Sequence, residues 1–367
     1  MKRKRVPKMI IGFSVLVVVL LLLILIIFPP SKGKIPQFYN ENGEVIENSL
    51  AEKCYLEVED GKLGMVIMAK DISNPVLLVC GGGPGIPEYL MEYMYPSCLA
   101  DKFVVCYLEY RGTGLSYSSD IKAEEMTTEK YISDVVTVSK YLSERFEQDK
   151  IYIMGHSFGT YVAIKTVQQY PEYYNAYIAM AQTCNQTESE YMAYDYMKAQ
   201  YEQIGNNKMV EKFENCPIRE SDEMYTKYFT SSLRDTAMHE LGVGTTRDMD
   251  SVITGIFFPS LRCKAYTWQE RINLWRGKGL SVQFPVVKDS THFNAFSEVP
   301  SLQIPIYFFA GKYDYTCCFD LQYEYYEQVD APIKEFYVFE NSAHSPIFEE
   351  PEEAAKLFET ILEAEQK

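Results

Sequence analysis

The chain has 367 residues and a formal net charge of −16 at pH 7, which is distributed unevenly along it. The first 34 residues hold seven basic and no acidic side chains, so the remaining 28 basic and 51 acidic side chains give the rest a net charge of −23. A body this acidic repels phosphate backbones, which excludes nucleic acid as an expected partner. Its length suits an α/β domain with an insertion better than one compact core.

An apolar segment follows the basic N-terminus. Residues 9–28 contain no charged side chain and are long enough to cross a hydrocarbon core of about 30 Å as a helix. A cleaved signal peptide is the alternative, but the segment exceeds an h-region of roughly 7–15 residues and Phe28 to Lys32 offers no small-x-small cleavage site. Five basic residues precede the segment, and only Lys32 and Lys34 follow it closely, so we expect a cytoplasmic N-terminus. The sequence thus predicts a single-pass membrane protein, with residues 1–34 as tail, transmembrane helix and linker and an extracytoplasmic body.

The next elements in chain order alternate between strands and helices. An antiparallel hairpin is expected over 54–69, because Asp60-Gly61 is a strong turn signal between alternating segments. We expect further strands at 76–80, 103–107, 177–181, 305–310 and 335–339, and one more that ends at 154. Helices are expected at about 129–146, at 158–170 and after Pro351. Continuous apolar runs that alternate with helices predict an α/β fold, with a mostly parallel sheet covered by helices on both faces.

The alternation stops in one long stretch. From Cys184 to about Pro300 the sequence is rich in Tyr and Met and helical in character, with breaks at glycine and proline residues. We interpret 184–300 as an inserted helical cap between two parts of one core, 35–183 and 301–367.

The nine cysteines do not predict a disulfide scaffold. An odd number cannot all pair within one chain, and Cys80 and Cys106 lie in expected core strands. One or two bridges among the loop cysteines stay open. No Cys-x-x-Cys or His-Glu-x-x-His pattern occurs and there are only four histidines, so we expect neither a metal nor another cofactor.

A candidate nucleophile lies where an expected strand turns into a helix. Gly155-His156-Ser157-Phe158-Gly159 has the Gly-x-Ser-x-Gly pattern of a sharp turn that exposes a serine at the end of a sheet. A serine held there adopts a strained backbone, and neighbouring side chains would collide unless both flanking residues were glycine. Ser157 is therefore the predicted nucleophile.

A serine hydroxyl needs a base within hydrogen-bonding reach and an acid that orients the base. His344 follows the last expected strand, and Asp314 follows the strand before it, so both are expected at the sheet edge where Ser157 lies. The chain order Ser, Asp, His also matches the pattern. His156, next to the nucleophile, is interpreted as a packing residue.

The oxyanion of a tetrahedral intermediate is best stabilised by backbone amides that the fold holds in place. The residue after the nucleophile, Phe158, supplies one amide. The second is expected from the glycine-rich loop 81–85, which ends the strand at 76–80, and we choose Gly83. The loop lacks the lysine and hydroxyl residue of a P-loop, so phosphate binding is not expected.

Together these motifs resemble the α/β-hydrolase superfamily, and specifically the proline iminopeptidase (prolyl aminopeptidase) family of serine peptidases, over about 76–361. The family's His-Gly-Gly-Pro-Gly oxyanion loop is matched by residues 81–85, and its Asp-Gln-Arg-Gly segment by 109–114. Gly81 stands where the family has histidine. Trp268-Gln269-Glu270 only faintly matches the Trp-x-x-Trp-Glu segment with which the family holds a substrate's amino terminus.

The resemblance implies an aminopeptidase acting on short peptides. Glu270 and Glu109 are the acids considered for binding a substrate's ammonium group. An esterase or lipase-like enzyme is the alternative, since Ser157, His344 and Asp314 would serve esters equally well. A membrane-tethered binding protein without turnover is a third hypothesis, and the three matched catalytic positions argue against it.

Overall fold

The computed structural model describes residues 28–365, together with Phe13, residues 17–19, Leu22 and residues 25–26. The expected transmembrane helix at 9–28 falls largely outside these residues. In the part of the chain that the structure describes, no helix is long and apolar enough to span a bilayer.

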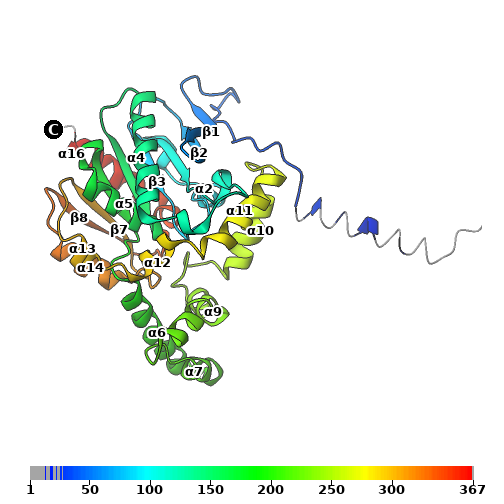
Figure 1. Ribbon diagram of the computed structural model, residues 1–367, viewed down its shortest axis with the longest axis vertical. Coiled ribbons are helices and arrows are strands. Elements are labelled where there is room, and N and C mark those ends of the chain that lie inside the picture. The colour runs from blue at the N-terminus through cyan, green and yellow to red at the C-terminus, as the bar shows by residue number, and fades with distance from the viewer. Residues whose placement is uncertain (1–12, 14–16, 20–21, 23–24, 27, 366–367) are drawn as a thin grey trace, which may run out of the picture.

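One eight-stranded sheet organises the molecule, in the order β1-β2-β4-β3-β5-β6-β7-β8 (Figure 1). The strands are β1 (Leu50–Val58), β2 (Gly61–Ala69), β3 (Val76–Cys80), β4 (Val104–Glu109), β5 (Ile151–His156), β6 (Tyr174–Met180), β7 (Ile306–Gly311) and β8 (Lys334–Phe339). The first two form the expected hairpin, and β2 pairs antiparallel with β4, whereas β3 to β8 are all parallel. The predicted mostly parallel sheet is therefore confirmed.

Helices cover both faces of this sheet, because alternate residues of each strand point to opposite sides. In β3, Leu78 contributes to a core with helices α4 (Thr128–Arg145), α5 (Phe158–Gln169) and α14 (Phe319–Gln328). Its neighbour Leu77 contributes to a second core with α2 (Tyr89–Met94), α3 (Leu99–Lys102) and α16 (Pro351–Glu365). The short α15 (Pro346–Glu349) precedes α16, and α2, α3 and α15 were not expected from the sequence.

The segment between β6 and β7 is built of helices. These are α6 (Gln186–Gln203), α7 (Asn207–Glu214), α8 (Asp222–Phe229), α9 (Ser232–Glu240), a π-helical turn (Ile253–Phe257), α10 (Phe258–Arg262), α11 (Trp268–Ser281), α12 (Pro285–His292) and α13 (Ala295–Glu298). Asn or Ser side chains cap the N-termini of α6 to α9, each accepting a backbone N–H of the first turn.

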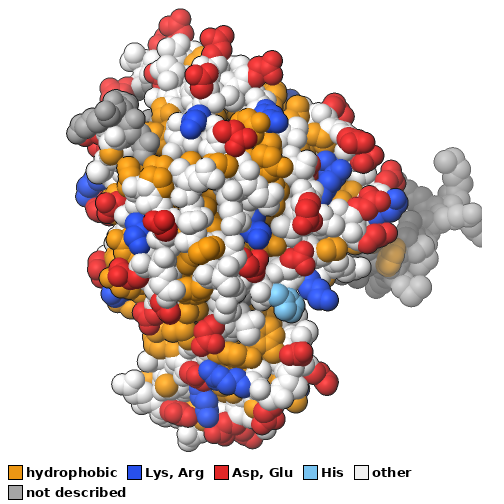
Figure 2. Space-filling model, turned by 60° about the vertical axis from the view of Figure 1, so that its left-hand side comes forward, with side chains coloured by type: hydrophobic (Ala, Val, Ile, Leu, Met, Phe, Trp, Pro, Cys, Tyr) orange, Lys and Arg blue, Asp and Glu red, His pale blue; other side chains and the backbone are white. Residues whose placement is uncertain are grey.

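The insertion has two parts. Helices α6 to α9 share a small core of their own and project away from the sheet (Figure 1). The second part, which includes α11, packs on the main body. The backbones approach closely there, since a Cβ built at Gly277 of α11 would lie only 2.7 Å from the Gly112 carbonyl oxygen. Acidic side chains are scattered over the face shown in Figure 2 rather than gathered in one patch.

All nine cysteines fall within the described residues, and all are free thiols. Eight are buried, and burial raises the pKa of Cys80 to about 12. They act as small hydrophobic residues in this fold.

Candidate active site

The turn between β5 and α5 holds Ser157 in a strained conformation. Its φ of 54° and ψ of −124° lie outside the regions that non-glycine residues ordinarily adopt. A Cβ at Gly159 would lie 1.9 Å from the Cys80 carbonyl oxygen, and one at Gly155 would lie 2.6 Å from the Thr160 Cα. Both glycines are therefore required by close backbone approach, as the sequence pattern predicts.

Asp314 and His344 follow β7 and β8, two neighbouring parallel strands, so both lie at the same edge of the sheet. His344 Nδ1 lies 3.0 Å from Asp314 Oδ2 and 3.1 Å from Oδ1. Asp314 is fully buried, and its carboxylate also accepts hydrogen bonds from Thr316 N, Cys317 N and Gln322 Nε2. These donors fix the position of the carboxylate, so it can orient the imidazole.

The loop that carries His344 lies against the serine turn. The ring of His156, the residue before Ser157, has its centroid 5.0 Å from that of His344, and its Nε2 lies 2.9 Å from the His344 carbonyl oxygen. The structure thus brings the three predicted residues Ser157, Asp314 and His344 to one end of the sheet.

A buried ion pair that the sequence analysis missed supports this arrangement. His156 Nδ1 lies 2.7 Å from Glu88 Oε1, and Glu88 Oε2 accepts the Gly82 N–H at 3.0 Å. Because both His156 nitrogens face acceptor oxygens, both carry hydrogen and the ring is charged. The pair links the glycine-rich loop, the serine turn and the His344 loop.

The pKa values of both partners favour the charged state. Burial alone would raise the pKa of the Glu88 carboxyl, but His156 and the Gly82 N–H outweigh it and hold this pKa below its usual value. Burial alone would lower the pKa of the His156 imidazole, but Glu88 outweighs it and raises this pKa. The interpretation of His156 as a packing residue was therefore incomplete. Glu88 lies in an irregular loop where no motif or periodicity marks it.

The predicted oxyanion donors belong to two segments that adjoin Ser157, the glycine-rich loop and the start of α5. A Cβ at Gly82 would lie 3.1 Å from the Ser157 Cβ, so the glycine-rich loop passes directly beside the serine. Gly83 has a φ of +39°, and apart from its two chain neighbours no described residue has a heavy atom within 4 Å of a Cβ built there. Phe158 begins α5, so its N–H belongs to the first turn, where amides lack intrahelical partners.

The two acids considered for substrate binding have other partners. Glu109 is buried beneath α11, where its carboxylate accepts from Tyr266 Oη at 2.7 Å and Leu115 N at 2.6 Å. Burial raises the pKa of Glu109 to about 7. The contact with Tyr266 is not visible in the sequence, because Tyr266 is distant along the chain.

Glu270 caps α11 and forms an ion pair with Lys53. It completes a capping box with Thr267, and Lys53 Nζ lies 2.7 Å from its Oε2. Burial alone would raise the pKa of this carboxyl, but the Lys53 ammonium and the Thr267 N–H hold it below its usual value. Both carboxylates therefore have structural roles that the expectation of substrate binding did not include.

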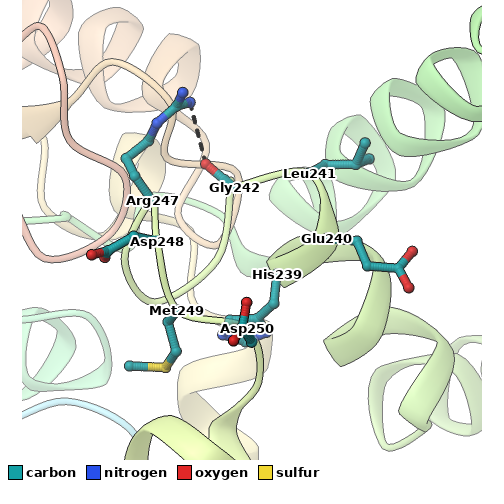
Figure 3. Close-up of a pocket in the computed structure, with 8 residues that line it drawn as sticks. All are labelled: His239, Glu240, Leu241, Gly242, Arg247, Asp248, Met249 and Asp250. Atoms are coloured by element: carbon teal, nitrogen blue, oxygen red, sulfur yellow. Dashed lines mark hydrogen bonds between the residues drawn. The ribbon is translucent and has the colours of Figure 1, made fainter.

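A hollow of about 510 Å³ lies between α9 and the π-helical turn, lined by residues 239–242 and 247–250. Figure 3 shows Arg247 turned back towards the Gly242 carbonyl oxygen, 3.3 Å from its Nη1. The same loop contacts the loop that carries His344, since His344 N donates to Gly244 O at 3.3 Å. Among the described residues, no group of three or more His, Cys, Asp or Glu side chains could hold a metal ion.

This fold and this strand-turn-helix serine define the α/β-hydrolase class. A family model described as the alpha/beta hydrolase fold matches residues 75–351, and the chain belongs to this family. It is 30% identical over 307 residues to a Bacillus subtilis (strain 168) protein named Probable aminopeptidase YbaC, an alignment that covers 83% of this chain and 94% of the relative.

Solved structures show the same fold. A proline iminopeptidase of Mycobacterium smegmatis superposes with a TM-score of 0.64 at 15% identity, over 86% of this chain and 99% of the other. An esterase of Exiguobacterium antarcticum superposes with a TM-score of 0.52 at 15% identity, over 85% and 99% of the two chains. The fold is thus shared by solved structures named as a peptidase and as an esterase.

Proposed function

We propose that this protein is a serine aminopeptidase that removes N-terminal residues from short peptides through Ser157, His344 and Asp314. The observation that carries the proposal is the buried Asp314–His344 hydrogen bond beside a strained serine turn. The relationship to a protein named as an aminopeptidase supports the choice of substrate class.

In the proposed reaction, Ser157 Oγ attacks the carbonyl carbon of the first peptide bond while His344 takes its proton. Asp314 holds the Nδ1–H of His344, which keeps Nε2 free to act as the base and stabilises the imidazolium that forms. His344 then protonates the leaving amine, and a water molecule activated by the same histidine hydrolyses the acyl-enzyme.

The negative charge on the tetrahedral oxygen is assigned to the backbone amides of Phe158 and Gly83. Glu88 already accepts the Gly82 N–H, so Gly83 is the better choice from the glycine-rich loop. A preorganised donor of this kind contributes about 10²- to 10³-fold to turnover.

The chemistry is tested with a fluorophosphonate probe and two variants of the full chain. The probe should label the wild-type protein covalently, and Ser157→Ala should abolish labelling without lowering thermal stability. His344→Ala should lose turnover by several orders of magnitude. Equal labelling of the serine variant would refute the assignment.

The substrate class is tested with matched pairs of substrates. Free-amine aminoacyl arylamides should be cleaved more efficiently than their N-acetylated counterparts, because a charge-assisted hydrogen bond to an ammonium contributes about 1.5–3 kcal/mol. If N-acetylated and plain acyl esters react as well as free amines, the enzyme is instead an esterase that uses the same residues.

We also propose that residues 9–28 anchor the enzyme in a membrane with its hydrolase body outside the cytoplasm. The uncharged length of this segment and the basic residues before it support the proposal. The full-length protein should resist carbonate extraction, and protease added outside intact cells should degrade its body. A soluble secreted chain that begins near Lys32 would mean that the segment is a cleaved signal peptide.

A further inference from the structure

An uncharged apolar stretch lies at the surface of the insertion. Residues 252–261 read Val-Ile-Thr-Gly-Ile-Phe-Phe-Pro-Ser-Leu, and of these only Ser260 is buried. Val252, Ile253 and Phe258 are 36%, 56% and 37% exposed. Soluble proteins ordinarily bury a run of this kind, and exposed apolar groups that gather in one place mark an interaction surface.

Helix α11 extends this surface. Trp268 and Ile272, one turn apart on the same side of the helix, are each 41% exposed. Trp275 lies on that side one turn further on, with its ring 4.8 Å from Phe257 and its Nε1 donating to Ser260 Oγ at 2.8 Å. We call the exposed apolar side chains of these two segments, which the Phe257–Trp275 contact joins, the apolar face; they are Val252, Ile253, Phe258, Trp268 and Ile272.

The N-terminal segment of the chain reaches the body at this face. Phe28, the last residue of the apolar segment 9–28, stacks on the Trp268 ring with centroids 5.5 Å apart. The Pro29 carbonyl oxygen accepts from Trp268 Nε1 at 2.9 Å and from Arg271 Nη1 at 2.7 Å. Ile35 is buried in the core beneath α2 and α16, so the linker is packed rather than loose. Figure 1 shows the linker that follows Phe28 running beside α10 and α11.

The basic residues beside the apolar face suit a position at the surface of a bilayer. Lys32, Arg262 and Lys264 are exposed beside it, and Ser31 Oγ donates to the Lys264 carbonyl oxygen. Cations at headgroup level, with tryptophan at the boundary between hydrocarbon and water, are typical of interfacial protein surfaces. The rest of the body is strongly acidic and would be repelled by anionic lipid.

We propose that the apolar face lies in the interfacial layer of the bilayer, beside the point where the N-terminal segment enters it. This inference rests on the proposed anchoring by residues 9–28 and adds a second contact, which fixes how the body is oriented. Because the apolar stretch begins two residues after Asp250, the hollow lined by residues 239–242 and 247–250 is held near the membrane surface.

The two tryptophans of the chain, Trp268 and Trp275, allow a direct test. The full chain is reconstituted in phosphatidylcholine vesicles whose acyl chains carry bromine close to the headgroup. In Trp275→Phe, the remaining Trp268 should lose about half of its fluorescence relative to unbrominated vesicles, because its ring lies at the depth of the quencher.

A matched control places a tryptophan elsewhere. Ile333, exposed beside β8 at the opposite edge of the sheet from β1, is changed to Trp in a chain that lacks Trp268 and Trp275. Its fluorescence should be unaffected by the brominated lipid. Unquenched Trp268 in vesicle-bound protein, or equal quenching at both positions, would overturn the inference.

Charged substitutions on the apolar face provide a second measurement. Ile253→Asp in the Trp275→Phe background should reduce the quenching of Trp268, because a carboxylate resists entry into the interface. Tyr323→Asp, at an exposed position of α14, should leave quenching unchanged. Quenching that is the same in both variants would contradict a role for the face.

Flotation on a density gradient separates the two proposals. If the protein floats with vesicles but Trp268 is not quenched, the anchor is retained and the apolar face does not contact lipid. If the full chain stays at the bottom of the gradient, the anchor fails, and the inference fails with it.

Discussion

The Glu88–His156 pair links three parts of the site, so its removal should affect both stability and turnover. We compare Glu88→Ala, which removes the carboxylate, with Glu88→Gln, which keeps its shape. In the alanine variant the Gly82 N–H and the His156 Nδ1 lose their partner in a buried place. In the glutamine variant the side-chain oxygen can still accept from Gly82, and its NH₂ can donate to a neutral His156.

The structure sets the expected magnitudes. Breaking a buried ion pair by removing one partner costs about 3–5 kcal/mol, and deprotonation of His156 relieves part of it, so we expect Glu88→Ala to lose about 3 kcal/mol in the free energy of unfolding. Glu88→Gln should lose about 1 kcal/mol, because its hydrogen bonds can be remade without charge. The alanine variant should also lose turnover by at least about tenfold, since the loop that holds Gly83 is no longer tied to the serine turn.

The pH dependence gives a signature that simple loss of packing would not give. The raised pKa of His156 contributes stability that is complete below its usual value near 6.5 and is lost as the pH rises through the raised value. The lowered pKa of Glu88 contributes stability that is complete above its usual value near 4.5 and is lost as the pH falls through the lowered value. The difference between wild type and Glu88→Gln should therefore be largest at about pH 5–6 and should narrow in alkaline solution.

Urea denaturation of the full chain in detergent, followed by tryptophan fluorescence at several pH values, measures these differences. Turnover of an aminoacyl arylamide is measured on the same samples. The Glu88–His156 contact is not a buried ion pair if the free energy of unfolding of Glu88→Ala lies within about 0.5 kcal/mol of the wild-type value. The same conclusion follows if the difference in this free energy between wild type and Glu88→Gln is equal at all pH values.

Three further outcomes are expected. Asp314→Asn should lower kcat by about 10⁴-fold with KM little changed, because the wrong tautomer of the base is then favoured; near-normal turnover would mean that another acid orients it. Burial raises the pKa of Glu109 to about 7, so the stability that the protonated carboxyl contributes is lost as the pH rises through this value. Glu109→Gln should therefore reduce the fall in melting temperature between pH 5 and 8. If the fall is as steep in the variant as in the wild type, titration of Glu109 does not cause it. Gly159→Ala should prevent folding or cost more than about 3 kcal/mol, because its Cβ would meet the Cys80 carbonyl oxygen at 1.9 Å. In α11, no described atom other than those of the adjoining helix residues lies within 4 Å of a Cβ at Gly279, so Gly279→Ala should be neutral or stabilising by up to about 1 kcal/mol in the same melting assay.

Features with a local cause were predictable from the residue order. The hairpin turn needs Asp60 and Gly61 at positive φ, the serine turn needs two flanking glycines, and a parallel strand leaves a continuous apolar run. The predicted strand and helix limits accordingly differ from the observed ones by a few residues at most. The placement of Asp314 and His344 at one edge also followed, because parallel strands end on the same side.

Contacts between distant segments could not be read in this way. Glu88 and His156 are 68 residues apart, and Glu109 and Tyr266 are 157 apart, so no spacing rule connects them. The antiparallel pairing of β2 with β4 likewise depends on how the sheet assembles, since β3 lies between them in the chain.

The proposed catalytic residues were predictable from local sequence, whereas the contacts of the residues around them were not. The chain's residue pattern alone was enough to nominate the nucleophile, its base and its acid, because strand ends and tight turns impose local steric demands on particular residue types. The folded chain alone revealed that Glu270 and Glu109 are engaged elsewhere, that His156 is charged and paired, and that Phe28 stacks on Trp268. Burial and pairing depend on which distant side chains converge, and that convergence arises only when the sheet and its insertion pack together.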